Sequence, residues 1–302
     1  MQNYIETNHL DFSFGNLKVL NDLSINVSQE SIYGFLGPNG AGKSTTIRAL
    51  LGLYKTNGDH VKIFGKRINN ENLSILKRIG ALVESPTLYD HLSGFDNLEI
   101  TRKLRGLPKN RTAEALKTVN LLQDARRAVK HYSMGMKQRL GLALTIISEP
   151  ELLILDEPTN GLDPHGIIEI RELLLSLKKE KGTTIFISSH ILSEIERIAS
   201  HVGIINKGKL LFQGALEELR EIGVSTVFIE TSEPERGLKL LQENNFPKSK
   251  LKETNLIETD IENKEEINII TRLLVKNEIP VLGINNSKKD LEQLFLDITK
   301  TN

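Results

Sequence analysis

The chain of 302 residues contains no cysteine, which excludes disulfide bridges and thiolate metal sites. It has no excess of either charge, because 39 basic residues balance 39 acidic ones, so no direct nucleic-acid partner is expected. Its longest apolar runs, such as Leu152 to Leu155, fall far short of the roughly 18 residues of a membrane-spanning helix. The start carries Glu6 and Asp11 and lacks the basic-then-apolar pattern of an export signal. We therefore expect neither export nor a span within this chain.

What the chain does contain is typical of a folded globular protein, with 26% charged and 39% hydrophobic residues. This length allows one large α/β domain and a small second one, because single cores stop growing near roughly 250 to 300 residues. Ile5 to Val27 alternates in short runs broken by turns, which predicts an antiparallel β flank. Ser31 to Leu36 is then a β-rich run before a glycine-dense loop, and Ser44 to Leu53 has helical spacing.

The middle of the chain predicts a helical insert in an α/β core. Between residues 85 and 150, apolar positions recur mostly at three and four residues. Leu152 to Leu155 and Thr183 to Ile187 are continuous apolar runs, which are typical of strands buried on both faces of a mostly parallel sheet. After Gly214 the pattern changes to short alternating helices and strands.

We therefore predict two domains. The first covers residues 1–220 and includes a helical subdomain at about 85–150, and the second is a small C-terminal accessory α/β domain at 221–302, with Gly223 near the boundary. The elements expected in this last part are helices at Ala215 to Glu221, Gly237 to Glu243, Glu265 to Val275 and Asp290 to Ile298, and strands at Thr226 to Glu230, Leu256 to Thr259 and Val281 to Ile284.

A phosphate-binding loop pattern lies between the predicted strand and helix, as this pattern requires. It reads Gly37, Pro38, Asn39, Gly40, Ala41, Gly42, Lys43 and Ser44. The glycines let successive backbone N–H groups curl round phosphates, Lys43 reaches the outer phosphates, and Ser44 offers its hydroxyl to Mg²⁺. The alternative is a glycine-rich turn that only caps a helix.

Four further polar residues follow predicted strands or precede a helix. Asp156 and Glu157 end an apolar strand, where Asp156 would hold Mg²⁺ and Glu157 would orient and deprotonate an attacking water. His190 ends another strand, where it either contacts the γ-phosphate or simply caps and packs. Ser133 is a plausible helix N-cap, and with the backbone at Gly135 it would present donors to an anion.

Together these elements resemble the ABC ATPase family across roughly residues 1–220. The resemblance implies a P-loop NTPase fold, ATP hydrolysis, and a head-to-tail homodimer in which Ser133 and Gly135 act in trans. It further implies separate membrane permease subunits that hold the chain on the cytoplasmic face of the membrane. Phe14 would stack on adenine, His190 would be the switch histidine, and Asn160 to Asp163 falls at the D-loop. The nucleotide-binding set implied in this way is Phe14, Gly37, Pro38, Asn39, Gly40, Ala41, Gly42, Lys43, Ser44, Thr45, Ser133 and Gly135.

Two departures from the family pattern suggest a subgroup. The usual Leu-Ser-Gly-Gly-Gln signature here runs from Tyr132 to Met136 and keeps only its serine and second glycine. Where the family generally has a glutamine, this chain has Glu84, which the resemblance places beside Mg²⁺ and the water; its alternative is a solvated loop acid before Pro86. Both features look like the ATPases that export bacitracin-type and lantibiotic peptides and protect the producer.

Other functions compete with this interpretation. A nucleotide-switched ABC protein without transport typically needs two cassettes, a basic surface or long coiled coils, and this chain has one phosphate loop, zero net charge and no sustained heptads. A non-hydrolysing regulatory module conflicts with the presence of Lys43, Glu157 and His190. An exporter ATPase for a different substrate stays open as an alternative.

Overall fold

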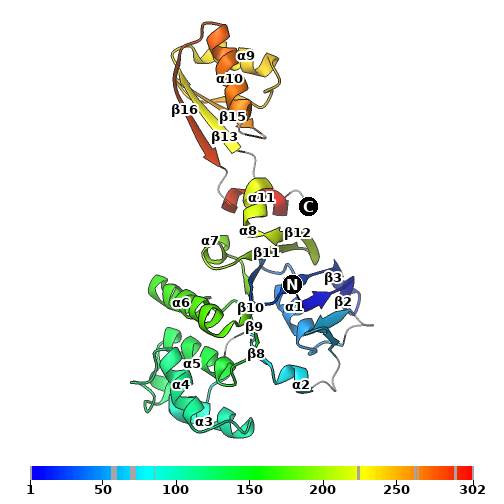
Figure 1. Ribbon diagram of the computed structural model, residues 1–302, viewed down its shortest axis with the longest axis vertical. Helices are drawn as coiled ribbons and strands as arrows, with labels where there is room; N and C mark the ends of the chain where they lie inside the picture. The colour runs from blue at the N-terminus through cyan, green and yellow to red at the C-terminus, as the bar shows by residue number, and fades with distance from the viewer. Residues whose placement is uncertain are drawn as a thin grey trace. The chain divides into compact units, whose positions relative to one another are not determined.

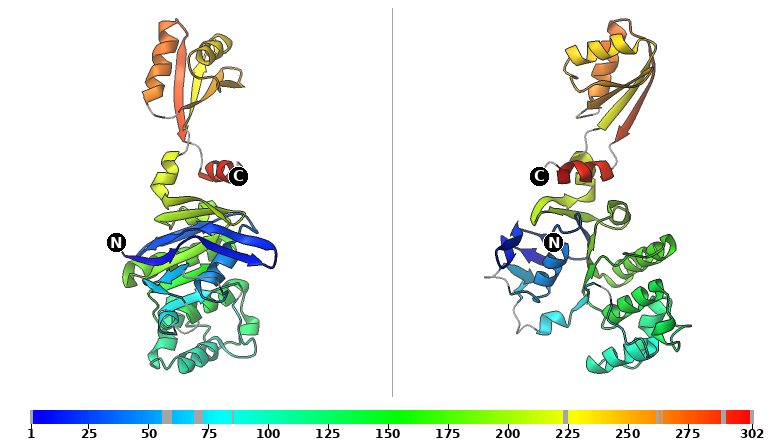
Figure 2. Two further views of the ribbon diagram at one scale, coloured as in Figure 1. Left: turned by 90° about the vertical axis from the view of Figure 1, so that its right-hand side faces the viewer. Right: turned by 180° about the vertical axis from the view of Figure 1, so that it is seen from behind.

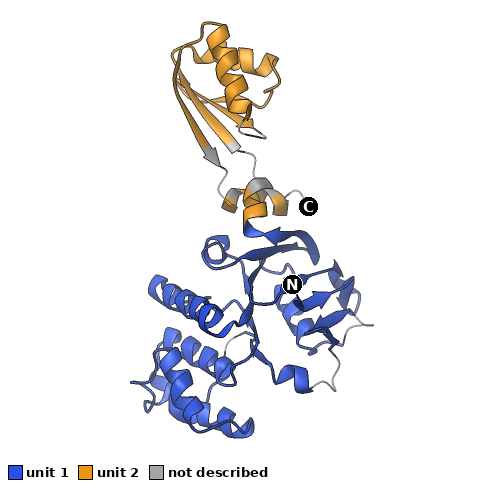
Figure 3. Cartoon of the chain, viewed as in Figure 1, with its two compact units in different colours: residues 1–216, 302 blue, residues 217–301 orange. Residues whose placement is uncertain are grey.

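The computed structural model describes residues 2–55, 60–68, 73–84, 86–222, 225–261, 263, 265–288 and 291–300. Ser85, Gly223 and Asp290, which the sequence patterns placed at the edges of segments, lie outside these residues. The chain divides into two compact units, Met1–Leu216 and Glu217–Thr301 (Figure 3). Each unit is described by itself below.

A six-stranded sheet in the order β12-β11-β5-β10-β9-β8 forms the centre of the first unit. The strands are β5 (Ile32–Leu36), β8 (Ile79–Leu82), β9 (Leu152–Asp156), β10 (Thr184–Ser189), β11 (His201–Asn206) and β12 (Lys209–Ala215). All neighbours pair in parallel except β11 and β12. Ser189 pairs with Leu36, and Ser188 pairs with Asp156. The segments that follow β5, β9 and β10 therefore meet at one edge of the sheet.

The predicted antiparallel β flank is present. It consists of β1 (Asn3–Thr7), β4 (Asn26–Ser28), β6 (Val61–Ile63) and β7 (Lys66–Arg67) in one sheet, and of the hairpin β2 (Leu10–Phe14) and β3 (Leu17–Leu23). Buried side chains of this flank join those of β5 and α1 (Lys43–Leu50) in one hydrophobic core. The helix α1 ends before the predicted Leu53, because Gly52 adopts φ +68° and Leu53 N donates to Arg48 O, a common helix stop.

Helices fill the predicted insert and the far side of the sheet. They are α2 (Leu73–Leu76), α3 (Gly94–Leu104), α4 (Asn110–Thr118), the 3₁₀ turn η1 (Val129–His131), α5 (Met134–Ile146), α6 (Pro164–Lys181) and α7 (Leu192–Ile195). Figure 1 shows the central sheet between α1 with the β flank on one side and α6 with α7 on the other. Glu99 joins α3 to α4, since Arg102 and Thr112 both donate to its carboxylate and hold its pKa down at about 2.

The second unit contains a four-stranded antiparallel sheet in the order β14-β15-β13-β16. Its elements follow one another as α8 (Leu216–Ile222), β13 (Ser225–Thr231), α9 (Pro234–Glu243), β14 (Lys250–Glu253), β15 (Leu256–Ile261), α10 (Glu265–Lys276), β16 (Val281–Lys288) and α11 (Leu291–Lys300). The run from β13 to β16 is the β-α-β-β-α-β arrangement of ferredoxin-like folds. Helices α9 and α10 cover one face of this sheet (Figure 2), and Val227, Ile257 and Leu274 pack between the layers.

Candidate active site

The loop from Gly37 to Gly42 joins β5 to α1. The local backbone conformation and the available space explain why glycine occupies three of its positions. Gly40 and Gly42 adopt φ +80° and +111°, a region that favours glycine. At Gly37 a Cβ atom would lie 2.4 Å from the carbonyl oxygen of Ile205. Lys43 begins α1 with only 6% of its side chain exposed, and its Nζ donates to Gly37 O at 2.7 Å. The loop thus offers a ring of backbone groups, and the ammonium group of Lys43 is hydrogen-bonded to it.

Ser188 connects the two acidic residues at the end of β9. Its hydroxyl donates to Asp156 Oδ1 at 2.6 Å and accepts from the backbone N–H of Glu157 at 3.0 Å. Asp156 is 4% exposed, whereas Glu157 adopts φ +47° and turns toward the phosphate loop. The two neighbouring carboxylates therefore occupy different environments.

Glu157 brings the three predicted catalytic residues together. Its Oε1 lies 3.1 Å from Lys43 Nζ, and its Oε2 lies 2.8 Å from His190 Nδ1. A carboxylate held between a lysine and an imidazole has the geometry of a general base whose orientation is set by its neighbours.

A cavity of about 500 Å³ opens over these groups. Its lining residues are Phe14, Leu17, Val19, Asn39, Gly40, Gly42, Lys43, Ser44, Thr45, Glu157, Asn160 and His190. Phe14 is 49% exposed, and its ring meets the edges or faces of Phe12 and Tyr54, which stack on each other. The sequence patterns did not identify Leu17 and Val19 as lining residues or Tyr54 as a neighbour of Phe14, because periodicity does not show which distant segments meet.

The residues that line this cavity do not include the predicted Gly37, Pro38, Ala41 and Asp156, nor the predicted anion-binding residues of α5. Ser133 caps α5 as predicted, accepting from Met136 N at 3.2 Å. A Cβ atom at Gly135 would find nothing closer than Leu162 Cδ2 at 3.9 Å. The structure does not bring Ser133 and Gly135 to the phosphate loop of the same chain.

Glu84 also lies apart from the residues that line the cavity. It adopts φ +63°, its side chain is 68% exposed, and its carboxylate accepts from the guanidinium of Arg48 on α1. Arg48 in turn lies 5.9 Å from the ring centre of Tyr54. The carboxylate predicted to lie beside Mg²⁺ is therefore paired with Arg48, which also lies near Tyr54, a neighbour of Phe14.

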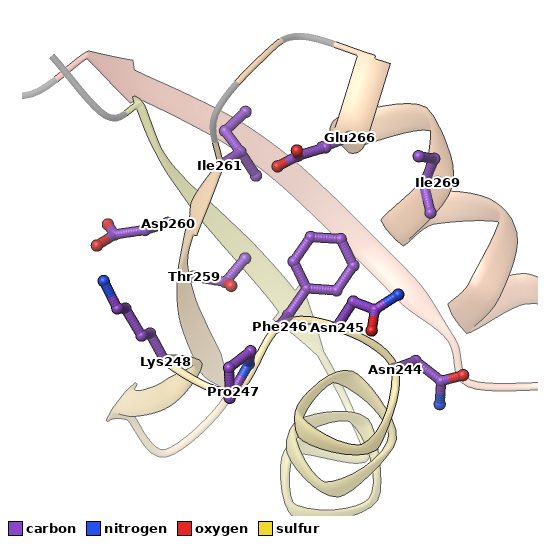
Figure 4. A pocket seen from close by; sticks show the side chains of 10 residues that line it. All are labelled: Asn244, Asn245, Phe246, Pro247, Lys248, Thr259, Asp260, Ile261, Glu266 and Ile269. Carbon is purple, nitrogen blue, oxygen red and sulfur yellow. The ribbon is translucent and has the colours of Figure 1, made fainter. Parts of the chain in front are cut away.

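A second cavity, of about 450 Å³, lies within the other unit (Figure 4). Its lining residues are Asn244, Asn245, Phe246, Pro247, Lys248, Thr259, Asp260, Ile261, Glu266 and Ile269. None of the predicted site residues belongs to it.

Comparison with known proteins identifies the family. Residues 20–160 match the profile of the ABC transporter family. The bacitracin transport ATP-binding protein BcrA of Bacillus licheniformis is 42% identical over 99% of this chain and 98% of its own length. This chain belongs to the ABC transporter ATP-binding proteins. The lantibiotic transport ATP-binding protein SrtF of Streptococcus pyogenes is 40% identical over 75% of this ABC ATPase and 98% of its own length.

Solved structures agree with this family. The cbiO1 protein of Clostridium perfringens, part of the transporter complex cbiONQ, is 25% identical with a TM-score of 0.68, and the match covers 82% of this ABC ATPase and 97% of that chain. An ATP-binding subunit of another ABC transporter is 28% identical with a TM-score of 0.65 over 72% and 92% of the two chains. The predicted P-loop fold and ABC ATPase membership are confirmed.

This ABC ATPase is thus an ATP-binding subunit that couples ATP hydrolysis to transport, the general activity of the family. Such subunits work with membrane permease components. In the described residues no helix combines the length and apolar character needed to span a bilayer.

Proposed function

We propose that this ABC ATPase powers the export of bacitracin-type or lantibiotic peptides and so protects the cell that makes it. The observation that carries the proposal is the similarity to the bacitracin transport protein over 99% of the chain, which includes both units. A relative named for lantibiotic transport supports the same substrate class. The unusual segment around Ser133 and the acid at Glu84 fit this subgroup.

The cradle and its lysine fit the triphosphate of ATP. Backbone N–H groups between Gly37 and Gly42 would bind phosphate oxygens, and Ser44 and Thr45 lie in the first turn of α1, whose N-terminus favours negative charge. Lys43 would leave its carbonyl partners for the outer phosphates. Phe14 would stack on adenine at the open side of the cavity.

The donor set at this edge also fits Mg²⁺, a cation that prefers oxygen ligands. The hydroxyl of Ser44 and the buried carboxylate of Asp156 would hold it, with Ser188 orienting that carboxylate. When bound, the ion neutralises charge that develops on the phosphates. Because Glu84 is paired with Arg48, we assign Glu84 the role of relaying nucleotide state to the permease rather than that of a ligand.

In hydrolysis, Glu157 would take a proton from the water whose oxygen attacks the γ-phosphorus, while the bond to the β-phosphate oxygen breaks and ADP leaves. His190 holds the second oxygen of Glu157 and would contact the γ-phosphate. Ser133 and Gly135 would complete the site from a second copy, in a head-to-tail homodimer, because they lie outside the cavity of their own chain.

Peptide tolerance in cells tests the substrate class. A susceptible bacterium would express the permease together with either the wild-type chain or its Glu157→Gln variant. The concentration of each antibiotic that inhibits growth would be measured. We expect the active pair to raise tolerance to bacitracin or a lantibiotic, and not to an unrelated non-peptide antibiotic, while the variant gives no protection. If the purified complex hydrolyses ATP but the cells that express it show no change in peptide tolerance, the proposed substrate class is wrong.

A further inference from the structure

A third cavity, of about 300 Å³, lies between α6 and the segment that follows His190. Its walls are largely aliphatic and include Ile168, Ile187 and Ile195. Ile187 and Ile195 are buried, whereas Ile168 on α6 is 41% exposed. A mostly apolar cavity with a few polar groups is the usual form of a small-molecule site.

Two arginines at this cavity give it a charge preference. Arg171 on α6 and Arg197 just after α7 both line it. In the stretches that the structure describes, neither guanidinium has an ion-pair or hydrogen-bond partner. Within the described residues, the acid that lines the cavity, Glu194, forms no ion pair with either arginine and accepts instead from Thr159 Oγ1 at 2.6 Å, so two positive charges face one negative charge at this cavity. Free arginines beside an aliphatic wall suit a ligand that joins an anionic head to an apolar chain.

The cavity is also connected to the catalytic residues. The segment Ile191 to Ile198 that forms one wall begins directly after His190, whose ring holds Glu157. The bond between Thr159 and Glu194 ties the same wall to the loop that follows Glu157. A ligand bound against this wall would therefore act on His190 and on the loop that follows Glu157.

We propose that this cavity binds a small anionic amphiphile, such as a medium-chain fatty acid, and that its occupation slows ATP hydrolysis. The proposed binding of the amphiphile does not depend on which substrate is transported. The proposed slowing of ATP hydrolysis rests on the role proposed for His190.

Calorimetric titration of the purified full chain with decanoate tests the proposed binding, with decanol as the uncharged control. We expect saturable binding of decanoate that Arg171→Gln and Arg197→Gln each weaken by about tenfold, because a charge-assisted hydrogen bond is lost. Arg272→Gln is the matched control, since that arginine is an exposed residue of α10 outside this cavity. Equal binding of decanol, or equal binding by the cavity variants, overturns the site.

ATP turnover measured over the same decanoate concentrations tests the proposed slowing of ATP hydrolysis. We expect turnover to fall with the same midpoint as binding, and the two arginine variants to need correspondingly more decanoate. Binding without any change in turnover overturns the coupling to His190 and leaves the peptide-export proposal untouched. If the assembled transporter no longer binds decanoate although the separate subunit does, a protein partner covers the cavity and the amphiphile site is wrong.

Discussion

The phosphate loop and the start of α5 both contain glycine, but for different reasons. At Gly37 the chain's own backbone leaves no room for a side chain, and at Gly42 the dihedral angle disfavours one. At Gly135 an added Cβ atom would meet only ordinary contacts, at 3.9 Å and beyond. The fold of one chain accounts for the first two glycines and not for the third. A requirement for glycine at position 135 must then come from something outside the chain.

The neighbours of Gly135 support this distinction. Met134 is largely exposed, and its side chain lies over Gly161 in the loop that follows Glu157. Gln138 donates to Pro158 O at 2.8 Å in the same loop. The start of α5 thus contacts the loop that follows its own catalytic glutamate, while none of its residues lines the cavity over its own phosphate loop. This arrangement suits a segment that completes the site of a second copy.

The largest effect is expected for Glu157→Gln. The amide keeps the hydrogen bonds to water but cannot accept a proton, so turnover should fall by roughly 10²- to 10⁴-fold while ATP still binds. An ATP-bound dimer should accumulate and appear in size-exclusion chromatography. Glu172→Gln, on the exposed side of α6, is the control. A monomeric Glu157→Gln protein with near-normal turnover would contradict both the base and the dimer.

Gly135→Ala should separate function from folding. The added methyl group has room within the chain, and alanine favours a helix over glycine by up to about 1 kcal/mol, so the melting temperature should hold or rise. Turnover should nevertheless fall by about a hundredfold, the scale of a 1 Å misplacement in an active site. Normal turnover in this variant would remove the argument that Gly135 serves a partner's nucleotide.

Gly37→Ala should show the opposite pattern. Its methyl group would collide with Ile205 O at 2.4 Å, and overpacking of this kind typically costs about 1–3 kcal/mol. Both the unfolding free energy and the affinity for ATP should fall, as thermal melts with and without ATP would record. Gly135→Ala is the matched control, and equal melting temperatures for the two variants would erase the contrast between the two glycines.

Sequence patterns predicted the elements that have strong local signals. The strand before Gly37, the insert helices and the ends of β9 and β10 follow from apolar periodicity and glycine spacing. They missed β14, because its four residues are all exposed and show no alternation. They also could not show that Arg48 would take the carboxylate of Glu84, or that Tyr54 would stack beside Phe14. Those contacts join segments far apart in sequence, which periodicity does not register.

The smallest effect is expected for Glu84→Gln, whose contacts separate it from the cavity. Its carboxylate pairs with Arg48 at the surface, and an exposed ion pair contributes little. Glu157 stays in place as the base, so turnover should change by less than about tenfold, or 1.4 kcal/mol of barrier. Peptide tolerance in cells should fall further than turnover, because the loop would relay nucleotide state to the permease.

Arg48→Gln extends this test, since it breaks the same pair from the other side. It should reproduce the loss of tolerance, and the exchange Glu84→Arg with Arg48→Glu should recover part of it by restoring opposite charges at the two positions. Turnover of the purified protein and growth with peptide would be measured for all three. A collapse of turnover in Glu84→Gln alone would make Glu84 catalytic, and unchanged tolerance in every variant would reduce it to a solvated loop acid.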